Sequence, residues 1–287
     1  MVQTAPAVQM SYFVRDGDAL APTELARGSW ATDSLHGVAL CGALGRAAER
    51  TVARLGRLAP DDLRAARITV DLFAAPGYRP CELATEVVRE GRRICLVDVR
   101  LTQGGKRVAR ASVLFLKATA SAPGEVWTST SGHTPPPLDV APPTDQPRVP
   151  FVRSGADWSQ DFSQHQDAAR KITWNSAVPI VAGEPLTPFQ AVAAIADGTN
   201  LAASWGAQGV QHINTDVTLV LAREPIGTEI GLAVTERLES DGIAVASAEV
   251  FDRQGALGIT TITTLANVHR SIDMGARDYA DDPRSRS

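Results

Sequence analysis

The sequence predicts an α+β protein made of two tandem units, each with a long central helix wrapped by an antiparallel sheet. Two stretches, 68–116 and 217–265, share one pattern of alternating apolar and polar residues, with turns at matching places. Each follows a segment rich in Ala and Leu whose apolar residues recur at helical spacing. A proline-rich segment separates the copies, so a duplication of about 150 residues is predicted rather than a solenoid of short repeats.

The first helix is expected within 33–55, "DSLHGVALCGALGRAAERTVARL". The antiparallel meander of 68–116 follows it. Its first strand ends at Pro76, and the turn-type sequences "EGRR" and "QGGK" then connect strands of alternating pattern. The stretch "HTPPPLDVAPPTDQPRVP" that comes next is dense in proline and favours extended, linker-like chain.

The second unit repeats this order. Thr187 is a suitable N-cap and Pro188 a suitable first residue for a helix within 187–205. The second meander has a strand ending at Pro225 and turns at "SDGI" and "RQGA". We therefore expect an N-terminal unit in 1–118, a linker in 119–172, a C-terminal unit in 173–270 and a flexible polar tail in 271–287.

Composition excludes several classes of protein. The chain of 287 residues is 44% hydrophobic and 21% charged, which is typical of a globular protein, and its net charge of −4 gives no support to a nucleic-acid partner. No apolar run is long enough to span a membrane, and the N-terminus lacks the pattern of a signal peptide. Three cysteines without a CxxC motif favour a reducing cytoplasm. The histidines outside the first helix lack metal-ligand spacing, so neither a metal nor a cofactor is expected.

Four segments, in this order, carry a resemblance to a known family: "SLHGVALCGALGRAAE", "PFQAVAAIAD", "HINTDVTLVLAREPIG" and "GIAVASAEVFDRQGALG". Together they resemble the TesB-like acyl-CoA thioesterase II family, over about residues 29–264. The resemblance implies a double hotdog fold and metal-free hydrolysis of acyl-CoA or another acyl thioester, with a place in fatty acid and lipid metabolism.

The resemblance also implies catalytic residues. In the family, an Asp on the second helix, a hydroxyl residue on the following strand and a Gln on the last strand hold and activate a water. These positions correspond to Asp197, to Asn214 or its neighbour, and to Ile262 or Thr263. The last strand, "GITTITTL", contains no Gln, so either Thr263 substitutes for it as a weaker water holder or the site is altered or inactive. The equivalent of Asp197 in the first unit is Ala47, which predicts one site per chain.

The residues themselves leave alternatives open. Burial of Asp197 would raise its pKa toward the range of a useful base, but a solvated helix-terminal Asp is the alternative. Gly37 would let a carbonyl approach the positive helix end, and His36 beside it is either a substrate contact or an ordinary helix residue. Asn214 and Thr218 fall with Asp216 at alternate positions of a strand, where they line a site or form a solvated face.

Three hypotheses follow. The first is an acyl-CoA thioesterase that uses water activated by Asp197. The second is a non-catalytic or weakly active acyl-thioester or lipid-binding protein, which the missing Gln favours. The third is a hydratase or dehydratase, ranked last because "ADGTN" has an Asp but no following His. Lys106, Arg107 and Arg110 are candidates for contact with CoA phosphates or simply a solvated hairpin. The sequence leaves acyl length and oligomeric state open, a homo-oligomer included.

Overall fold

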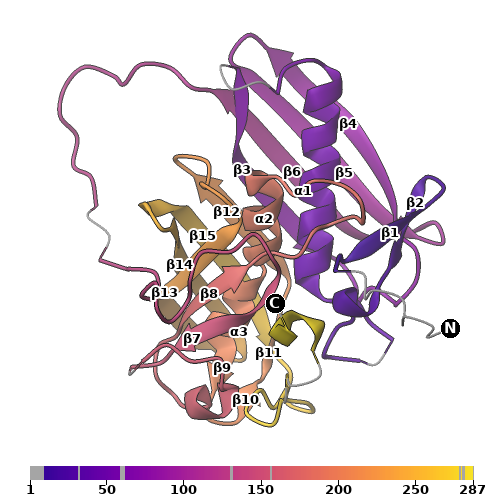
Figure 1. Cartoon of the computed structure of the whole chain (residues 1–287). Helices are drawn as coiled ribbons and strands as arrows, with labels where there is room; N and C mark the ends of the chain where they lie inside the picture. The colour runs from indigo at the N-terminus through magenta and orange to yellow at the C-terminus, as the bar shows by residue number, and fades with distance from the viewer. Residues whose placement is uncertain are drawn as a thin grey trace, which may run out of the picture.

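One antiparallel sheet runs through both halves of the chain (Figure 1). The structure is a computed structural model that describes residues 10–31, 33–58, 62–129, 132–155, 157–277, 279 and 282–286. Within these ranges the strand order is β4-β5-β6-β3-β12-β15-β14-β13-β8-β7, and β11 pairs with β15 beside this path. The two halves join where β3 pairs with β12, with Thr69 opposite Thr218.

The N-terminal half contains a hairpin, a short 3₁₀ helix, the central helix and four long strands. Their bounds are β1 (Phe13–Asp16), β2 (Ala19–Pro22), η1 (Glu24–Ala26), α1 (Gly37–Arg54), β3 (Leu63–Leu72), β4 (Glu82–Gly91), β5 (Ile94–Gln103) and β6 (Lys106–Lys117). The C-terminal half begins with two short strands and a second 3₁₀ helix: β7 (Arg148–Arg153), η2 (Phe162–His165) and β8 (Ile172–Ser176). Then come α2 (Pro188–Ile195), α3 (Gly198–Ser204), β9 (Trp205–Gly206), β10 (Gly209–Val210), β11 (His212–Asn214), β12 (Asp216–Leu221), β13 (Glu229–Ser240), β14 (Ile243–Asp252), β15 (Gly255–Ala266) and η3 (Pro283–Arg286).

The two halves repeat one topology. Read outward from the β3–β12 joint, the order is β3-β6-β5-β4 on one side and β12-β15-β14-β13 on the other. Each series follows a helix that packs on it, and the apolar residues of both halves share one core cluster. The predicted architecture of two tandem units, each with a central helix wrapped by an antiparallel sheet, is therefore confirmed.

Small residues let the two central helices approach closely. A Cβ added at Gly42 would lie 3.1 Å from the Ala194 methyl, and one added at Gly45 would lie 3.0 Å from the Ala193 methyl. Larger side chains at these positions would push α1 and α2 apart. This close packing brings the first turn of α1 beside the end of α2, and that juxtaposition creates the candidate site.

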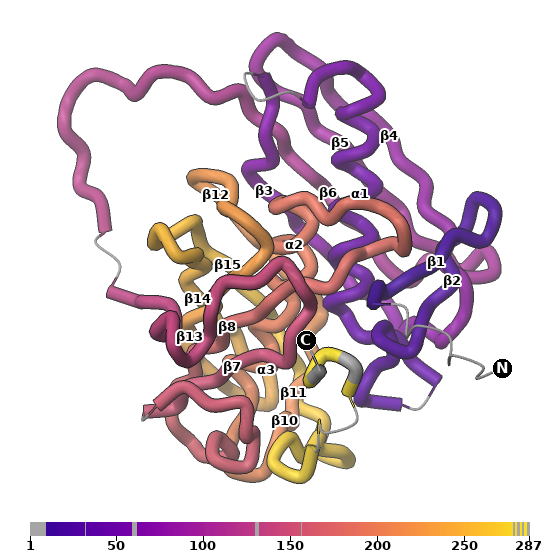
Figure 2. Tube along the Cα trace, in the orientation of Figure 1, coloured from indigo at the N-terminus to yellow at the C-terminus, as the bar shows by residue number. Residues whose placement is uncertain are grey.

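The structure differs from the sequence predictions at three places. The helix expected over 187–205 is interrupted at Ala196 and Asp197, between α2 and α3. The segment expected to be a linker contains β7, because buried Val149 and Val152 give it an apolar face that packs with Phe162. Within it, the described residues from 119 to 129 are exposed and swing away from both halves (Figure 2).

The third difference is the C-terminal segment, which the sequence predicts to be a flexible tail. Ile272 exchanges two backbone hydrogen bonds of 2.9 Å with Val210. Met274 is buried with Phe162, and Tyr279 packs against the same cluster. Apolar side chains spaced along a polar sequence hold this segment against the body of the protein.

Candidate active site

Asp197 occupies the junction between α2 and α3. The helix before it is almost entirely apolar and buried, which carries Asp197 into the interior and leaves the residue only 9% exposed. Its carboxylate faces the first turn of α1. The Asn214 amide Nδ2 donates a hydrogen bond of 2.8 Å to Asp197 Oδ1, and the backbone N–H of Val38 donates another to the carboxylate. The acid of one unit is thus held by the helix end of the other.

Burial determines the proton affinity of this carboxyl group. Desolvation raises the pKa of Asp197 from 3.8 to about 6, and the hydrogen bonds from Asn214 and Val38 lower it less than burial raises it. A carboxylate with a pKa near 6 is mostly ionised at neutral pH and binds a proton more strongly than a solvated Asp. Those are the properties of a general base.

Gly37 is the residue that permits this approach. A Cβ built at Gly37 would overlap the Asp197 carboxylate. Any other residue at this first position of α1 would force the acid away. The sequence singled out Gly37 for contact with a carbonyl, and in the structure the neighbour of Gly37 is the Asp197 carboxylate.

His36 caps the same helix. Its Nδ1 accepts a hydrogen bond of 3.0 Å from the backbone N–H of Ala39, so Nε2 carries the proton that it donates to the Leu25 carbonyl at 2.8 Å. Burial lowers the pKa of His36 from 6.5 to about 4, which keeps the imidazole neutral. Both ring nitrogens are therefore engaged within the protein, so the expected contact of His36 with a substrate is not through them.

The register of pairing with β15 changes between Asn214, at the end of β11, and Thr218, on β12. Asn214 lies opposite Thr264, whereas Thr218 lies opposite Thr261, so the pairing shifts by one residue between β11 and β12. Asn214 and buried Thr264 therefore point to the inner face of the sheet, toward Asp197, while Thr218 points to the outer face. The interpretation of Asn214, Asp216 and Thr218 as a stripe on one face is wrong.

Asp216 stabilises this irregularity. Its Oδ1 accepts a hydrogen bond of 3.1 Å from the backbone N–H of Thr263, which lies across the shifted pair. The backbone N–H of Thr215 donates to the Thr263 carbonyl at 2.9 Å. These two hydrogen bonds provide acceptors for the backbone N–H groups of Thr263 and Thr215, which regular strand pairing would otherwise satisfy. Thr218, which was expected to bind substrate, instead meets Thr69 across the β3–β12 joint at 3.4 Å between hydroxyls.

The structure does not bring Thr263 to Asp197. On β15 the buried residues Thr260, Ile262 and Thr264 alternate with more exposed residues, and Thr263 belongs to the outer set. The inner residue at the place expected for a Gln is therefore Ile262, which is 2% exposed and has no polar atom in its side chain. Of the three predicted catalytic residues, only Asp197 and Asn214 meet.

A cavity of about 630 Å³ opens beside Asp197 and Asn214. This volume is typical of small-molecule sites. The N-terminal unit, the C-terminal unit and the C-terminal segment all contribute to its walls, which include Tyr12, Leu25, His36, Val38, Leu40, Phe73, Arg148, Asn175, Asn200, Leu201, Met274, Arg277, Tyr279 and Arg284. Within the described ranges, no three His, Cys, Asp or Glu side chains come together as ligands for a metal ion.

Comparison with protein families decides what kind of protein this is. Residues 26–116 match the acyl-CoA thioesterase N-terminal domain, and residues 132–263 match the acyl-CoA thioesterase C-terminal domain. The chain belongs to the acyl-CoA thioesterase family. Membership supports hydrolysis of acyl thioesters as its general activity. Among curated proteins, none matches the sequence.

Solved structures show that the thioesterase has the expected double hotdog fold. The TesB protein of Mycobacterium avium subspecies paratuberculosis superposes with a TM-score of 0.62 at 16% identity, over 88% of this chain and 95% of that chain. An acyl-CoA thioesterase II of Mycobacterium marinum gives 0.58 at 13% identity, over 94% and 98%. A hot dog fold protein of Alicyclobacillus acidocaldarius gives 0.59 at 19% identity, over 93% and 100%. The resemblance to TesB-like thioesterases is confirmed.

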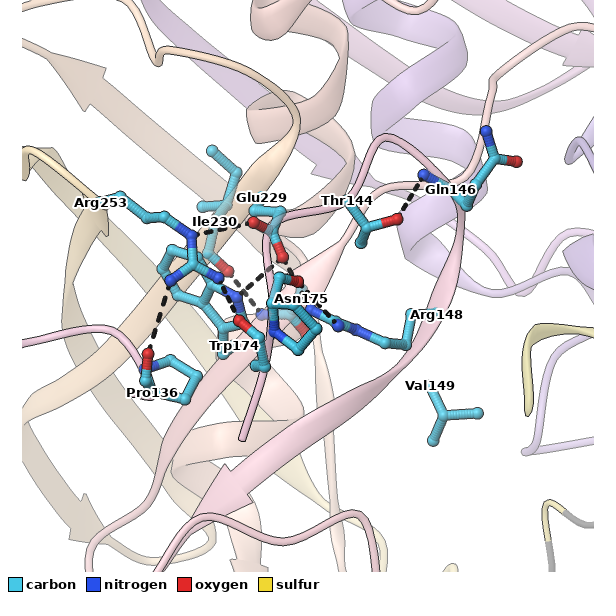
Figure 3. A network of polar contacts seen from close by, with 12 residues as sticks. Pro136, Thr144, Gln146, Arg148, Val149, Trp174, Asn175, Glu229, Ile230 and Arg253 are labelled. Carbon is cyan, nitrogen blue, oxygen red and sulfur yellow. Dashed lines mark hydrogen bonds and ion pairs between the residues drawn. The ribbon is translucent and has the colours of Figure 1, made fainter. Parts of the chain in front are cut away.

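A buried ion-pair network supports one wall of the thioesterase cavity (Figure 3). Glu229 on β13 accepts hydrogen bonds from Arg148 at 2.8 Å and Trp174 at 3.1 Å through Oε1, and from Arg253 at 3.1 Å through Oε2. Arg148 lines the cavity, and Arg253 also donates to the Ala141 carbonyl at 2.6 Å. The network thereby joins β7 and the chain before it to β8 and β13.

The candidate phosphate-binding residues lie outside this cavity. Lys106 and Arg107 are exposed on the β5–β6 hairpin and do not line it. Arg110 donates to Asp71 at 2.6 Å in a largely exposed ion pair. Of the described helices of the thioesterase, none combines the length and the apolar character that crossing a membrane requires.

Sequence reasoning missed the N-terminal hairpin, whose flanking residues line the cavity, and the C-terminal segment, which supplies part of the cavity wall. The hairpin has a sequence signal, since "RDGD" is a turn between two short apolar runs. Tyr12 immediately precedes that hairpin. The C-terminal segment has only scattered apolar residues, and no local pattern distinguishes it from a solvated tail.

Proposed function

We propose that this protein hydrolyses acyl-CoA or a related acyl thioester, with the Asp197 carboxylate as the general base for an attacking water. The observation that carries the proposal is a buried carboxylate of raised pKa that borders a cavity and accepts a hydrogen bond from Asn214. Membership of the acyl-CoA thioesterase family supports the same reaction.

The reaction uses the proton of one water. Asp197 accepts a proton as the water oxygen adds to the thioester carbonyl carbon, and the carbonyl electron pair moves onto oxygen. When that pair returns, the carbon–sulfur bond breaks, and the departing thiolate takes the proton from Asp197. The products are a free acid and a thiol. Asn214 orients the carboxylate throughout and keeps its pKa from rising further.

A second candidate function is binding of acyl thioesters with weak or no turnover. The observation in its favour is Ile262, an apolar residue at the inward-facing position of β15 where the family resemblance implies a Gln. A water held by Asp197 without that amide is less well positioned, and misplacement near a reacting centre costs on the order of 10²-fold in rate. We therefore expect weak hydrolysis of simple straight-chain acyl-CoA.

Release of free thiol from a panel of acyl-CoA chain lengths tests the proposal. We expect wild-type protein to release thiol and Asp197→Asn to lower turnover by at least about 10²-fold while remaining folded. Ala47, which the sequence repeat aligns with Asp197, cannot act as a base. Undiminished turnover in a folded Asp197→Asn protein would exclude Asp197 as the base. Saturable binding of acyl-CoA without thiol release would favour the binding function.

A further inference from the structure

Tyr12 has a hydroxyl group for which the described residues provide no partner. The residue is 6% exposed and lines the cavity. No hydrogen bond to its hydroxyl comes from the part of the chain that the structure describes, although buried tyrosine hydroxyls usually have one. Among the described residues, the side-chain atoms that are fully buried without a hydrogen-bond partner are Arg67 Nε, His165 Nε2, Ser176 Oγ and Trp205 Nε1. The Tyr12 hydroxyl is not one of these atoms, so it is not enclosed in the core. It is therefore accessible from the cavity.

Backbone and ring contacts hold Tyr12 in place. Its backbone N–H donates to the Pro179 carbonyl at 2.9 Å, and its carbonyl accepts from the backbone N–H of Thr23 at 2.9 Å. Its ring meets the His36 ring edge to face, with centroids 5.2 Å apart and planes at 84°. His36 precedes Gly37, which touches Asp197. A rigid chain of contacts thus places the phenol at the same helix end as the catalytic acid.

Two hydrogen-bond donors near this helix end are already in use. The N–H of Val38 and the amide of Asn214 both donate to the Asp197 carboxylate. Hydrolysis of a thioester needs a donor for the negative charge that develops on the carbonyl oxygen. The Tyr12 hydroxyl is a suitable donor that the carboxylate does not occupy.

The phenol also keeps its proton over the working range of such an enzyme. Burial raises the pKa of Tyr12 from 10 to about 12; the charge of Asp197 adds to this rise, and the charge of Arg284 opposes it. Tyr12 is thus a neutral donor between about pH 6, above which Asp197 is ionised, and about pH 12.

We propose that the Tyr12 hydroxyl donates a hydrogen bond to the carbonyl oxygen of the bound acyl thioester and stabilises the oxyanion. This inference rests on the proposed hydrolytic function. As water adds, the carbonyl electron pair moves onto the oxygen that Tyr12 contacts, and the phenol proton stays on Tyr12. When the pair returns and the carbon–sulfur bond breaks, the hydrogen bond weakens to its starting strength. Tyr12 would supply from the N-terminal unit a polar contact that β15 does not provide.

Turnover of Tyr12→Phe is the first test. Phenylalanine keeps the ring against His36 and removes only the hydroxyl. We expect kcat to fall by about 10²- to 10³-fold with little change in KM, as for loss of an oxyanion donor. Tyr78→Phe is the matched control, because Tyr78 lies outside the cavity and its hydroxyl bonds to Glu24 at 3.0 Å. Wild-type kcat in a folded Tyr12→Phe protein would overturn the inference, even if Asp197→Asn is inactive.

Binding of two acyl-CoA analogues gives a readout that does not depend on turnover. One replaces the thioester sulfur by CH₂ and keeps the carbonyl, whereas the other is a thioether without the carbonyl. We expect Tyr12→Phe to weaken calorimetric binding of the ketone by up to about tenfold and to leave thioether binding unchanged. Equal effects on both analogues, or none on either, would overturn the inference.

The two tests together separate this inference from the proposed function. Ketone binding that depends on Tyr12, in a protein that releases no thiol, would support the carbonyl contact and contradict hydrolysis. Hydrolysis that depends on Asp197 but not on Tyr12 would support the function and contradict the inference. A wild-type protein that binds neither analogue would contradict both.

Discussion

Asn214 and Asp197 are joined by a hydrogen bond of 2.8 Å from the Asn214 amide to Asp197 Oδ1, although they lie on different elements and 17 residues apart. The bond opposes the effect of burial on the pKa of Asp197, which is raised to about 6. It also fixes the orientation of a carboxylate that borders the cavity. The strength of the base and its position therefore depend in part on this amide.

Removal of that amide should change the pH dependence of hydrolysis. A general base acts when ionised, so wild-type kcat/KM should fall as pH is lowered through about 6. In Asn214→Ala the carboxylate loses a donor that favours its charged form, so the midpoint should move to higher pH. Asn175→Ala is the control, since Asn175 lines the cavity but bonds to Thr173 and Ile230. A midpoint that stays in place in Asn214→Ala would refute this account.

A methyl group at Gly37 should displace Asp197. Alanine at the first position of α1 suits a helix, but its Cβ would overlap the Asp197 carboxylate. We expect Gly37→Ala to lower turnover on the order of 10²-fold with a far-UV circular dichroism spectrum like that of wild type. Gly198→Ala is the control, because its Cβ would meet Leu232 at an ordinary 3.4 Å. Equal losses in both variants would contradict the steric explanation.

Introduction of a Gln on the inner face of β15 should raise hydrolysis. Ile262→Gln places an amide on the inner face, two residues before Thr264, the cross-strand neighbour of Asn214. That amide can donate to or accept from a water beside Asp197. Thr263→Gln, on the outer face, should leave turnover unchanged. We expect a several-fold rise in kcat for Ile262→Gln alone, measured by thiol release at a pH above 7. If only Thr263→Gln raises kcat, the assignment of the two faces is wrong.

Loss of the His36 cap should destabilise the protein. His36→Ala removes the acceptor for the Ala39 N–H and the donor to Leu25, and we expect the free energy of unfolding at pH 7 to fall by about 1–2 kcal/mol. His36→Asn keeps a capping acceptor and should lose less. Urea denaturation measures both variants. Equal losses would show that capping by the side chain contributes nothing.

The pH dependence of stability distinguishes wild type from His36→Asn. The folded-state pKa of His36 is lowered to about 4 from 6.5, so the folded protein binds fewer protons than the unfolded chain between these values. This contribution to stability is present above pH 6.5 and is lost as pH falls through 4. Wild type should therefore lose more stability than His36→Asn between pH 7 and pH 4.

Local patterns in the sequence determined the architecture and the acid. Alternation between turn-type sequences specified the strands of both units, and helical spacing specified the central helices, because each pattern reports burial within one element. Asp197 was recognisable as a charged residue at the end of an apolar helix. Gly37 was recognisable as a glycine at a helix start, but its close contact with the Asp197 carboxylate was not.

The tertiary structure alone decided which side chains meet. The shifted pairing at Thr215 turns Asn214 inward and leaves Thr218 outward, and a shift of one residue reverses the face of every later side chain. The same alternation on β15 faces Ile262 inward and Thr263 outward. Contact of Asp197 with Gly37 requires α1 to pack on α2 across the two units, and the position of Tyr12 beside His36 requires the chain before β1 to pack against the start of α1. No window of the sequence contains these long-range contacts, because they depend on pairings between segments far apart in the chain.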